Sequence, residues 1–245
     1  MLIWLVLIPL IAAALIGLCK APARPTALLS ASLTLALGIW ALVSFDGCSS
    51  CWSRFEGMDL QLTLAPALSK VMLLLTILVT FATVLGTNPP QGGEASWYNS
   101  ALLISAGATG AFLSDNIISF FAFHELALIP TFVMIGLYGR GDRRTTAWRA
   151  TLYLGLASMV LLAALLMIGT QAGFTFSGLK DFMASGRELA HAELIGALLI
   201  AGFGTLISLF PFHSWAAPAY ASAPAPVAMM HAGVLKKFGL YGLFM

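Results

Sequence analysis

Charged residues are scarce in this sequence. They make up 9% of its 245 residues, whereas 60% are hydrophobic, which is far from the averages of soluble domains. With twelve lysines and arginines against ten acidic residues, the formal net charge is only +2. The chain therefore lacks the basic stripe that nucleic-acid binding requires, and we expect no nucleic-acid partner. The composition indicates a protein surrounded by lipid.

Cysteines are also few. Cys19, Cys48 and Cys51 do not supply the two ligand pairs of a structural zinc site, so we expect no metal. Cys48 and Cys51 enclose two serines in a polar loop, where they form a loop disulfide or stay as two idle thiols; a redox role is the alternative. The sequence has no iron–sulfur ligand pattern, flavin motif or dinucleotide fingerprint, and we expect no cofactor on this chain.

No basic segment precedes the first apolar run. Residues 2–18 are apolar, and the first positive charges, Lys20 and Arg24, follow them. A secretory signal peptide has the reverse order. This run is therefore expected to be a retained helix whose C-terminal flank is cytoplasmic.

Long uncharged runs, in contrast, are abundant. A helix needs about 20 apolar residues to cross about 30 Å of hydrocarbon. Runs of this kind fall at residues 2–18, 26–45, 65–86, 99–115, 117–138, 147–170, 192–210 and 224–244. The predicted fold class is all-α, a polytopic membrane protein of about eight transmembrane helices. Asp115 and Asn116 separate the fourth and fifth runs, which predicts a tight polar turn.

Positive charges predict the orientation in the membrane. The predicted loop 139–149 holds Arg140, Arg143, Arg144 and Arg149. Alternating helices put this loop on the same side as Lys20 and Arg24. Because such residues stay on the cytoplasmic side, the N-terminus is predicted outside, in a bacterial inner (plasma) membrane. The opposite loops, 46–64 and 171–191, are acidic or balanced, and the second has the apolar pattern of an amphipathic segment at the interface.

Glu125 lies about 12 Å along the fifth run, near the bilayer centre. A charged side chain there costs roughly 2.5–3.5 kcal/mol, so something must retain it. Burial penalises the carboxylate, which suits a group that takes up and releases protons. Pro130 frees a backbone carbonyl and kinks the helix beside it. The alternative is a neutral Glu125 that hydrogen-bonds between helices, and the adjacent His124 is equally compatible with packing.

The eighth run holds three ionisable residues, His231, Lys236 and Lys237. Consecutive helical residues point about 100° apart, so at most one lysine faces a narrow path unless the other faces a neighbour or the interface. A lysine near a buried carboxylate makes a switchable proton site. The alternative is that both lysines snorkel to an interface.

The seventh run ends in a proline-rich segment, which predicts a broken seventh helix. Its prolines are Pro211, Pro218, Pro224 and Pro226. Non-helical backbone in a membrane is tolerated only inside protein or beside water. His213 lies on this segment, where it is a candidate for an aqueous entrance or a structural loop residue.

Two stretches, FFAFHELALIP (120–130) and PFHSWAAPAYASAPAPVAMMHAGVLKKFGLYG (211–242), resemble the signature segments of the antiporter-like membrane-subunit family. That family includes chains L, M and N of respiratory complex I (NADH-quinone oxidoreductase), the large subunits of multi-subunit sodium/proton antiporters, and membrane subunits of energy-converting hydrogenases. The resemblance is greatest to the first half of chain M. In it, a fifth-helix glutamate matches Glu125, and the lysine of the pattern AG-x-L-x-K-x-G-x-Y-G matches Lys237, which makes Lys236 the additional one.

The resemblance runs from about residue 65 to the end. It implies a fold of two inverted five-helix repeats, of which this chain holds the first. It also divides the chain into an N-terminal two-helix segment with an outer loop, residues 1–64, and an antiporter-like proton-translocating domain, residues 65–245. Family members are longer and the sequence stops within a helix, so we expect a fragment or one part of a split protein.

The sequence departs from the family at two positions. The family's seventh-helix lysine falls at Leu206, which cannot carry a proton. His231 stands where chain L commonly has a histidine and chain M an aliphatic residue. The implied relay, from Glu125 through a seventh-helix lysine to an eighth-helix lysine, therefore lacks its middle member, and His231, Lys236 or water replaces it.

The favoured hypothesis is a proton-translocating membrane subunit of complex I. Quinone reduction elsewhere in the complex then shifts a Glu/Lys pair between protonation states, and this chain is a non-redox part of the translocase without independent catalysis. The expected proton relay is Glu125, Lys237, Lys236, His231 and His213. Flavin, iron–sulfur clusters and quinone are expected in partner subunits, and the other partners are membrane subunits, the lipid bilayer, and protons or sodium.

Two alternatives stay open. One is a subunit of a sodium/proton antiporter or of an energy-converting hydrogenase, in which the same residues exchange cations. The other is an inert remnant or scaffold.

Overall fold

The computed structural model of the chain describes residues 1–44, 49–55, 58–89 and 92–245, with the side chains of 49–60 left out. Helices dominate the described residues, and they follow the predicted apolar runs closely. They are α1 (Trp4–Gly17), α2 (Ala23–Ser44), α3 (Ala67–Gly86), α4 (Glu94–Leu113), α5 (Ile117–Tyr138), α6 (Arg143–Ala172), α7 (Phe176–Ala184), α8 (Ala192–Ile207), α9 (Ala216–Ser222), α10 (Ala225–Met230), the π-helical turn η1 (His231–Leu235) and α11 (Lys236–Phe244).

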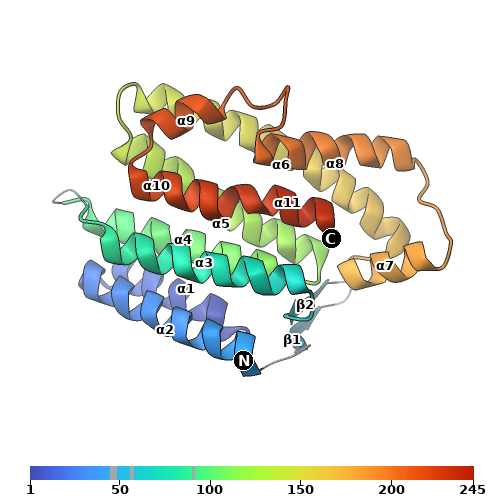
Figure 1. Cartoon of the computed structure of the whole chain (residues 1–245), viewed down its shortest axis with the longest axis horizontal. Coiled ribbons are helices and arrows are strands. Elements are labelled where there is room, and N and C mark those ends of the chain that lie inside the picture. The colour runs from blue at the N-terminus through green and yellow to red at the C-terminus, as the bar shows by residue number, and fades with distance from the viewer. Residues whose placement is uncertain (45–48, 56–57, 90–91) are drawn as a thin grey trace.

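The long helices lie side by side in layers (Figure 1). From one edge to the other, the layers are α1 with α2, α3 with α4, α5 with α10–η1–α11, and α6 with α8. Within the described residues, α2, α3, α5 and α6 are long and apolar enough to cross a membrane, and α1 and α8 are shorter apolar helices. The mostly helical, membrane-type fold predicted from the runs is thus confirmed at this level.

A two-stranded antiparallel hairpin was not predicted. Strands β1 (Ser49–Phe55) and β2 (Met58–Thr63) pair where the sequence indicated an outer loop of an all-α protein. Polar and apolar residues alternate along Asp59–Thr63, the period-two pattern of a strand, in a segment too short to stand out beside the helices. Cys48 and the side chain of Cys51, to which the disulfide prediction refers, lie outside the described residues.

The polar turn between α4 and α5 was predicted correctly, and it has a structural role. Asn116 caps α5, because its side-chain oxygen accepts hydrogen bonds from the N–H groups of Ile118 (2.9 Å) and Ser119 (3.0 Å). The Asp115 carboxylate accepts bonds from the N–H (3.1 Å) and hydroxyl (2.6 Å) of Ser177 on α7. The backbone N–H of Asp115 donates to the Gln61 carbonyl in β2 (2.9 Å). The turn therefore ties the hairpin and α7 to one end of the bundle.

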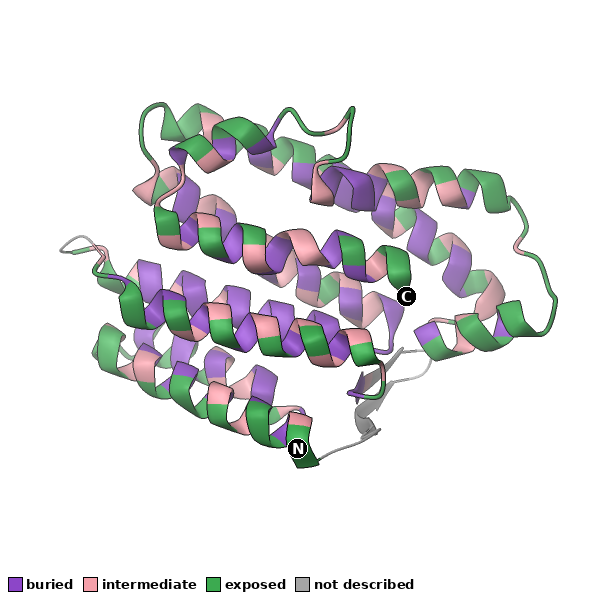
Figure 2. Cartoon of the chain, viewed as in Figure 1, coloured by how far each residue is buried: buried purple, intermediate pink, exposed green. Residues whose placement is uncertain are grey.

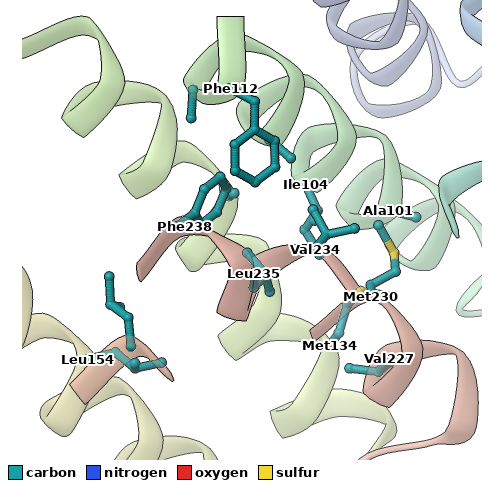
Figure 3. Packing of buried hydrophobic residues seen from close by; sticks show 14 of the residues in the cluster. Ala101, Ile104, Phe112, Met134, Leu154, Val227, Met230, Val234, Leu235 and Phe238 are labelled. Carbon is teal, nitrogen blue, oxygen red and sulfur yellow. The ribbon is translucent and has the colours of Figure 1, made fainter. Parts of the chain in front are cut away.

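The core is centred on α4, where almost every residue from Trp97 to Leu113 is buried (Figure 2). Alanine, glycine and serine are frequent there, so neighbouring backbones approach closely. The α10–η1–α11 segment packs into this core, with the ring centroids of Phe112 and Phe238 4.9 Å apart (Figure 3). Val234 and Leu235, which precede the two lysines, are also buried in this cluster.

The eighth run is not the single regular helix that we predicted. The N–H of Lys236 donates to the carbonyl of His231, five residues back, and this bond belongs to the π-helical turn between α10 and α11. A π turn holds one more residue than an α-helical turn, and such turns often occur at functional sites. The directions expected for His231, Lys236 and Lys237 from a regular helix therefore change.

The basic residues of the α1–α2 and α5–α6 corners lie at the other end of the bundle from the hairpin. Trp97 at the start of α4 contacts Tyr138 at the end of α5 (4.9 Å between ring centroids). Lys20 lies in the nearby α1–α2 connection, and Arg24 is in the first turn of α2. The predicted loop 139–149 was too long: α6 begins at Arg143. Asp142 caps this helix by accepting a bond from Thr145 N–H (3.3 Å), so Arg143, Arg144 and Arg149 are helical and Arg140 stays in the connection.

Candidate proton-transfer site

Glu125 faces a pocket of about 300 Å³ between α5 and α6. The pocket walls are mostly apolar, and the lining includes Phe132, Trp148 and Leu154. The Glu125 side chain keeps 31% of its surface exposed, so its carboxyl group opens onto the pocket and is not sealed in the core. His231, from the π turn, lines the same pocket. Two ionisable residues more than a hundred positions apart are thus brought to one space.

His124 is the second polar group beside Glu125. Its side chain is completely buried, and its Nδ1 lies 3.3 Å from Glu125 Oε1, an ion-pair contact when the ring is protonated. The ring packs edge-on against Phe238, 5.1 Å away between centroids. Neither ring nitrogen makes a hydrogen bond to the described residues. A buried imidazole with unsatisfied nitrogens is rare in apolar surroundings, and Nδ1 of this one faces the Glu125 carboxyl group.

His231 is almost fully buried, with 4% of its surface exposed. Its Nδ1 and the hydroxyl of Tyr220 lie 3.2 Å apart, a hydrogen bond whose donor depends on the tautomer of the ring. Its Nε2 makes no hydrogen bond to the described residues. The ring is flanked by Trp215 and Tyr220, both 5.4 Å away between centroids.

Lys236 completes this group. Its Nζ lies 4.8 Å from the centre of the Tyr220 ring and 5.9 Å from that of Trp215, within the range of cation–π interactions. We call Tyr220 and Trp215, whose rings flank both Lys236 and His231, the aromatic cage. Lys237 is partly exposed and makes no hydrogen bond or ion pair in the described part of the chain.

Leu206, where the family has its seventh-helix lysine, is an aliphatic and buried residue. Leu206 is 3% exposed and packs beside Gly239 of α11. The adjacent Thr205 accepts a hydrogen bond at its carbonyl from Trp215 Nε1 (3.0 Å), which fixes the cage against the end of α8. The helix ends there at Ser208 in the left-handed conformation, so the predicted break is present.

The structure brings together some of the predicted site residues and leaves others apart. Glu125 and His231 share the pocket, and Lys236 joins His231 through the cage. His213 is exposed, and its ring contacts Phe210 at 5.6 Å, outside the group. Tyr220 and Trp215 were not singled out, because nothing in a proline-rich segment indicates that its aromatic rings fold back over the next helix.

Across residues 1–44, 61–89 and 92–245, whose side chains the structure describes, no three histidine, cysteine, aspartate or glutamate side chains gather closely enough to hold a metal ion. The arrangement is instead suited to moving protons, because a carboxyl group, an imidazole, a phenol and an amine lie in or beside one largely apolar space.

Residues 114–245 match the family model described as NADH:quinone oxidoreductase/Mrp antiporter, transmembrane. Among similar proteins, NAD(P)H-quinone oxidoreductase chain 4 2 of Microcystis aeruginosa is 34% identical over 182 residues, covering 72% of this chain and 32% of the relative. Chain 4 1 of Picosynechococcus is 32% identical over 198 residues, covering 78% of this chain and 36% of the relative. The chain thus spans about a third of the length of these curated relatives.

Solved structures share the fold. A chain of respiratory complex I from Thermus thermophilus with bound NADH superposes with a TM-score of 0.86 at 25% identity, covering 100% of this chain and 52% of that one. A chain of the Mrp complex from Dietzia gives 0.83 at 22% identity, covering 98% and 27%. Since the family model covers more than half of the sequence, this multi-pass membrane chain belongs to the NADH:quinone oxidoreductase/Mrp antiporter family of membrane subunits.

Proposed function

We propose that this chain is part of a proton-translocating membrane subunit of an NADH-quinone oxidoreductase. The observation that carries the proposal is the pocket that Glu125 and His231 both line, although they come from different helical segments. The curated relatives named above are NAD(P)H-quinone oxidoreductase chains, which favours this function over that of a sodium/proton antiporter subunit. The chain contributes no redox chemistry of its own and acts as a non-redox subunit of the translocase.

The chemistry rests on the cost of charge in an apolar pocket. A carboxylate among apolar walls is penalised unless a positive charge lies near, so the proton occupancy of Glu125 depends on the charge of its neighbours. His124 lies against the carboxyl group, His231 lines the same pocket, and Lys236 lies beside His231 in the cage. A small rearrangement at the pocket, driven by quinone reduction in partner subunits, then loads or releases a proton at Glu125.

The placement in the membrane follows from the same proposal. The helical segments at the eight apolar runs cross the bilayer, the chain holds the first of two inverted five-helix repeats, and the residues divide into 1–64 and a translocating domain at 65–245. The basic end of the bundle is cytoplasmic and the N-terminus is outside, in a bacterial inner membrane. The partners are other membrane subunits of the complex, and flavin, iron–sulfur clusters and quinone belong to them.

The substitution Glu125→Gln tests the proposal, because glutamine keeps the size and polarity of the side chain but cannot exchange a proton. We expect the assembled complex carrying it to lose proton pumping in inverted membrane vesicles while its subunits still assemble. Glu193→Gln, on the exposed first turn of α8, is the matched control and should pump normally. Full pumping by Glu125→Gln would refute the role.

A further inference from the structure

The two adjacent lysines differ sharply in their surroundings. Lys236 Nζ lies over the rings of Tyr220 and Trp215, whereas Lys237 makes no hydrogen bond or ion pair in the described part of the chain. The family pattern points to Lys237 as the functional amine, and the geometry points to its neighbour. We propose that Lys236, with His231 and Tyr220, forms a second proton-transfer station beside the Glu125 pocket. This inference rests on the proposed function and names the residues through which the pocket passes its proton on.

The π turn places Lys236 beside His231. In a regular α-helix, residues five apart point about 140° apart, so Lys236 would face away from the histidine. Here the N–H of Lys236 bonds to the carbonyl of His231, so the turn holds an extra residue and the angle between the two side chains is smaller. Both side chains contact Tyr220.

The cage holds the amine in place and links it to the imidazole. Tyr220 takes part twice, because its hydroxyl bonds to His231 Nδ1 (3.2 Å) and its ring receives Lys236 Nζ (4.8 Å). Trp215 lies against both partners as well, 5.4 Å from the His231 ring and 5.9 Å from Nζ. A cation–π contact holds an ammonium without a carboxylate partner, so the charge is retained but not locked in an ion pair.

The station also lies where the family relay is interrupted. Trp215 donates to the Thr205 carbonyl (3.0 Å), next to the aliphatic Leu206 at the end of α8. The Trp215 ring thus contacts Lys236 on one side and is bonded to the end of α8 on the other.

The proton transfer balances without electrons or a further reactant. Protonated Glu125 releases its proton, through water in the pocket, and Nε2 of His231 gains one. The ring then passes its Nδ1 proton to the Tyr220 oxygen as that hydroxyl releases its own proton to a water molecule, which gives one to the neutral amine of Lys236 over the ring. The amine becomes an ammonium, and Tyr220 and His231 return to their neutral forms. One proton has moved from the pocket to Lys236, and the reverse sequence releases it.

Lys236→Arg is the decisive variant. Arginine keeps the positive charge and the cation–π contact but is not deprotonated in proteins, so it preserves a structural role and blocks a proton-transfer role. In vesicles with the assembled complex, we expect the ratio of protons pumped to quinone reduced to fall by the whole share that this subunit carries, as it does in Glu125→Gln. Lys180→Arg on α7, where the side chain is exposed, is the matched control and should leave the ratio unchanged.

Tyr220→Phe separates the hydroxyl from the ring. It removes the bond to His231 and keeps the surface on which Lys236 lies, so a purely structural cage predicts normal pumping. We expect a loss comparable to that of Lys236→Arg, and no further loss when the two are combined, because both interrupt one path. Wild-type pumping by Lys236→Arg overturns the inference. If Glu125→Gln is inactive at the same time, the proposed function stands and the second station alone falls.

Discussion

Gly107 allows a close approach of α4 to the backbone of the helix that carries Glu125. A Cβ atom at this position would lie 2.6 Å from the Phe123 carbonyl oxygen, 2.8 Å from the Ala127 nitrogen and 3.0 Å from the Ala127 Cβ. Two of these atoms belong to the backbone of α5, on either side of Glu125, and do not move unless the whole helix moves. Gly107→Ala is therefore a test of whether packing positions the pocket.

The expected cost follows from these distances. The contact of 2.6 Å is about 0.9 Å shorter than an optimal separation of about 3.5 Å, so α4 and α5 must separate locally. Overpacking of this kind costs about 1–3 kcal/mol, and contacts to backbone argue for the upper half of that range. Replacing glycine by alanine within a helix by itself stabilises the protein by about 0.5–1 kcal/mol. The net loss for Gly107→Ala should be about 1–2.5 kcal/mol.

Unfolding of the purified chain in mixed detergent micelles measures this loss. The matched control is Gly196→Ala on α8, where an added Cβ meets no atom within 4 Å and should be neutral or stabilising. In the assembled complex, Gly107→Ala should also lower proton pumping, because α5 shifts under Glu125. Equal stability of the two alanine variants would refute the reasoning that a rigid α4–α5 contact holds the site.

Two further predictions concern the α4–α5 turn. Asp115→Ala removes both bonds to Ser177, so we expect a loss of about 1–3 kcal/mol and faster hydrogen exchange in α7; unchanged exchange there would contradict the role of this carboxylate. Asn116→Ala removes the cap of α5 and should cost about 1 kcal/mol in the same micelle assay, whereas Asn116→Asp, which also caps, should cost much less. Equal losses of stability from the two Asn116 variants would show that the loss does not come from the missing helix cap.

The lengths of the apolar runs predicted the helices well, because a helix that crosses a membrane must match the thickness of the hydrocarbon layer. The spans expected at 65–86 and 117–138 agree with α3 and α5 almost to the residue. Errors arose where local hydrogen bonds decide. Asp142 starts α6 early, and the period-two segment after Met58 pairs as β2. Neither effect changes the apolar content of a window, so neither is visible in a count of uncharged residues.

The site was only half predictable. Glu125 stands out as a charge within an apolar run, and the structure places it in a pocket. His231 is also visible as an ionisable residue, but its meeting with Glu125 depends on how α10 and η1 pack against α5. Which of Lys236 and Lys237 lies beside His231 depends on a π turn. No residue pattern predicts this turn, because the same sequence is compatible with a regular helix.

The central claim is that Glu125 changes its protonation state as the complex turns over. Infrared difference spectroscopy measures this directly, because a protonated carboxyl group has a C=O stretching band that a carboxylate lacks. We predict a carboxyl band that appears or disappears between the resting and quinone-reducing states of the complex and is absent from Glu125→Gln. A difference spectrum in which that substitution removes no band would contradict the account.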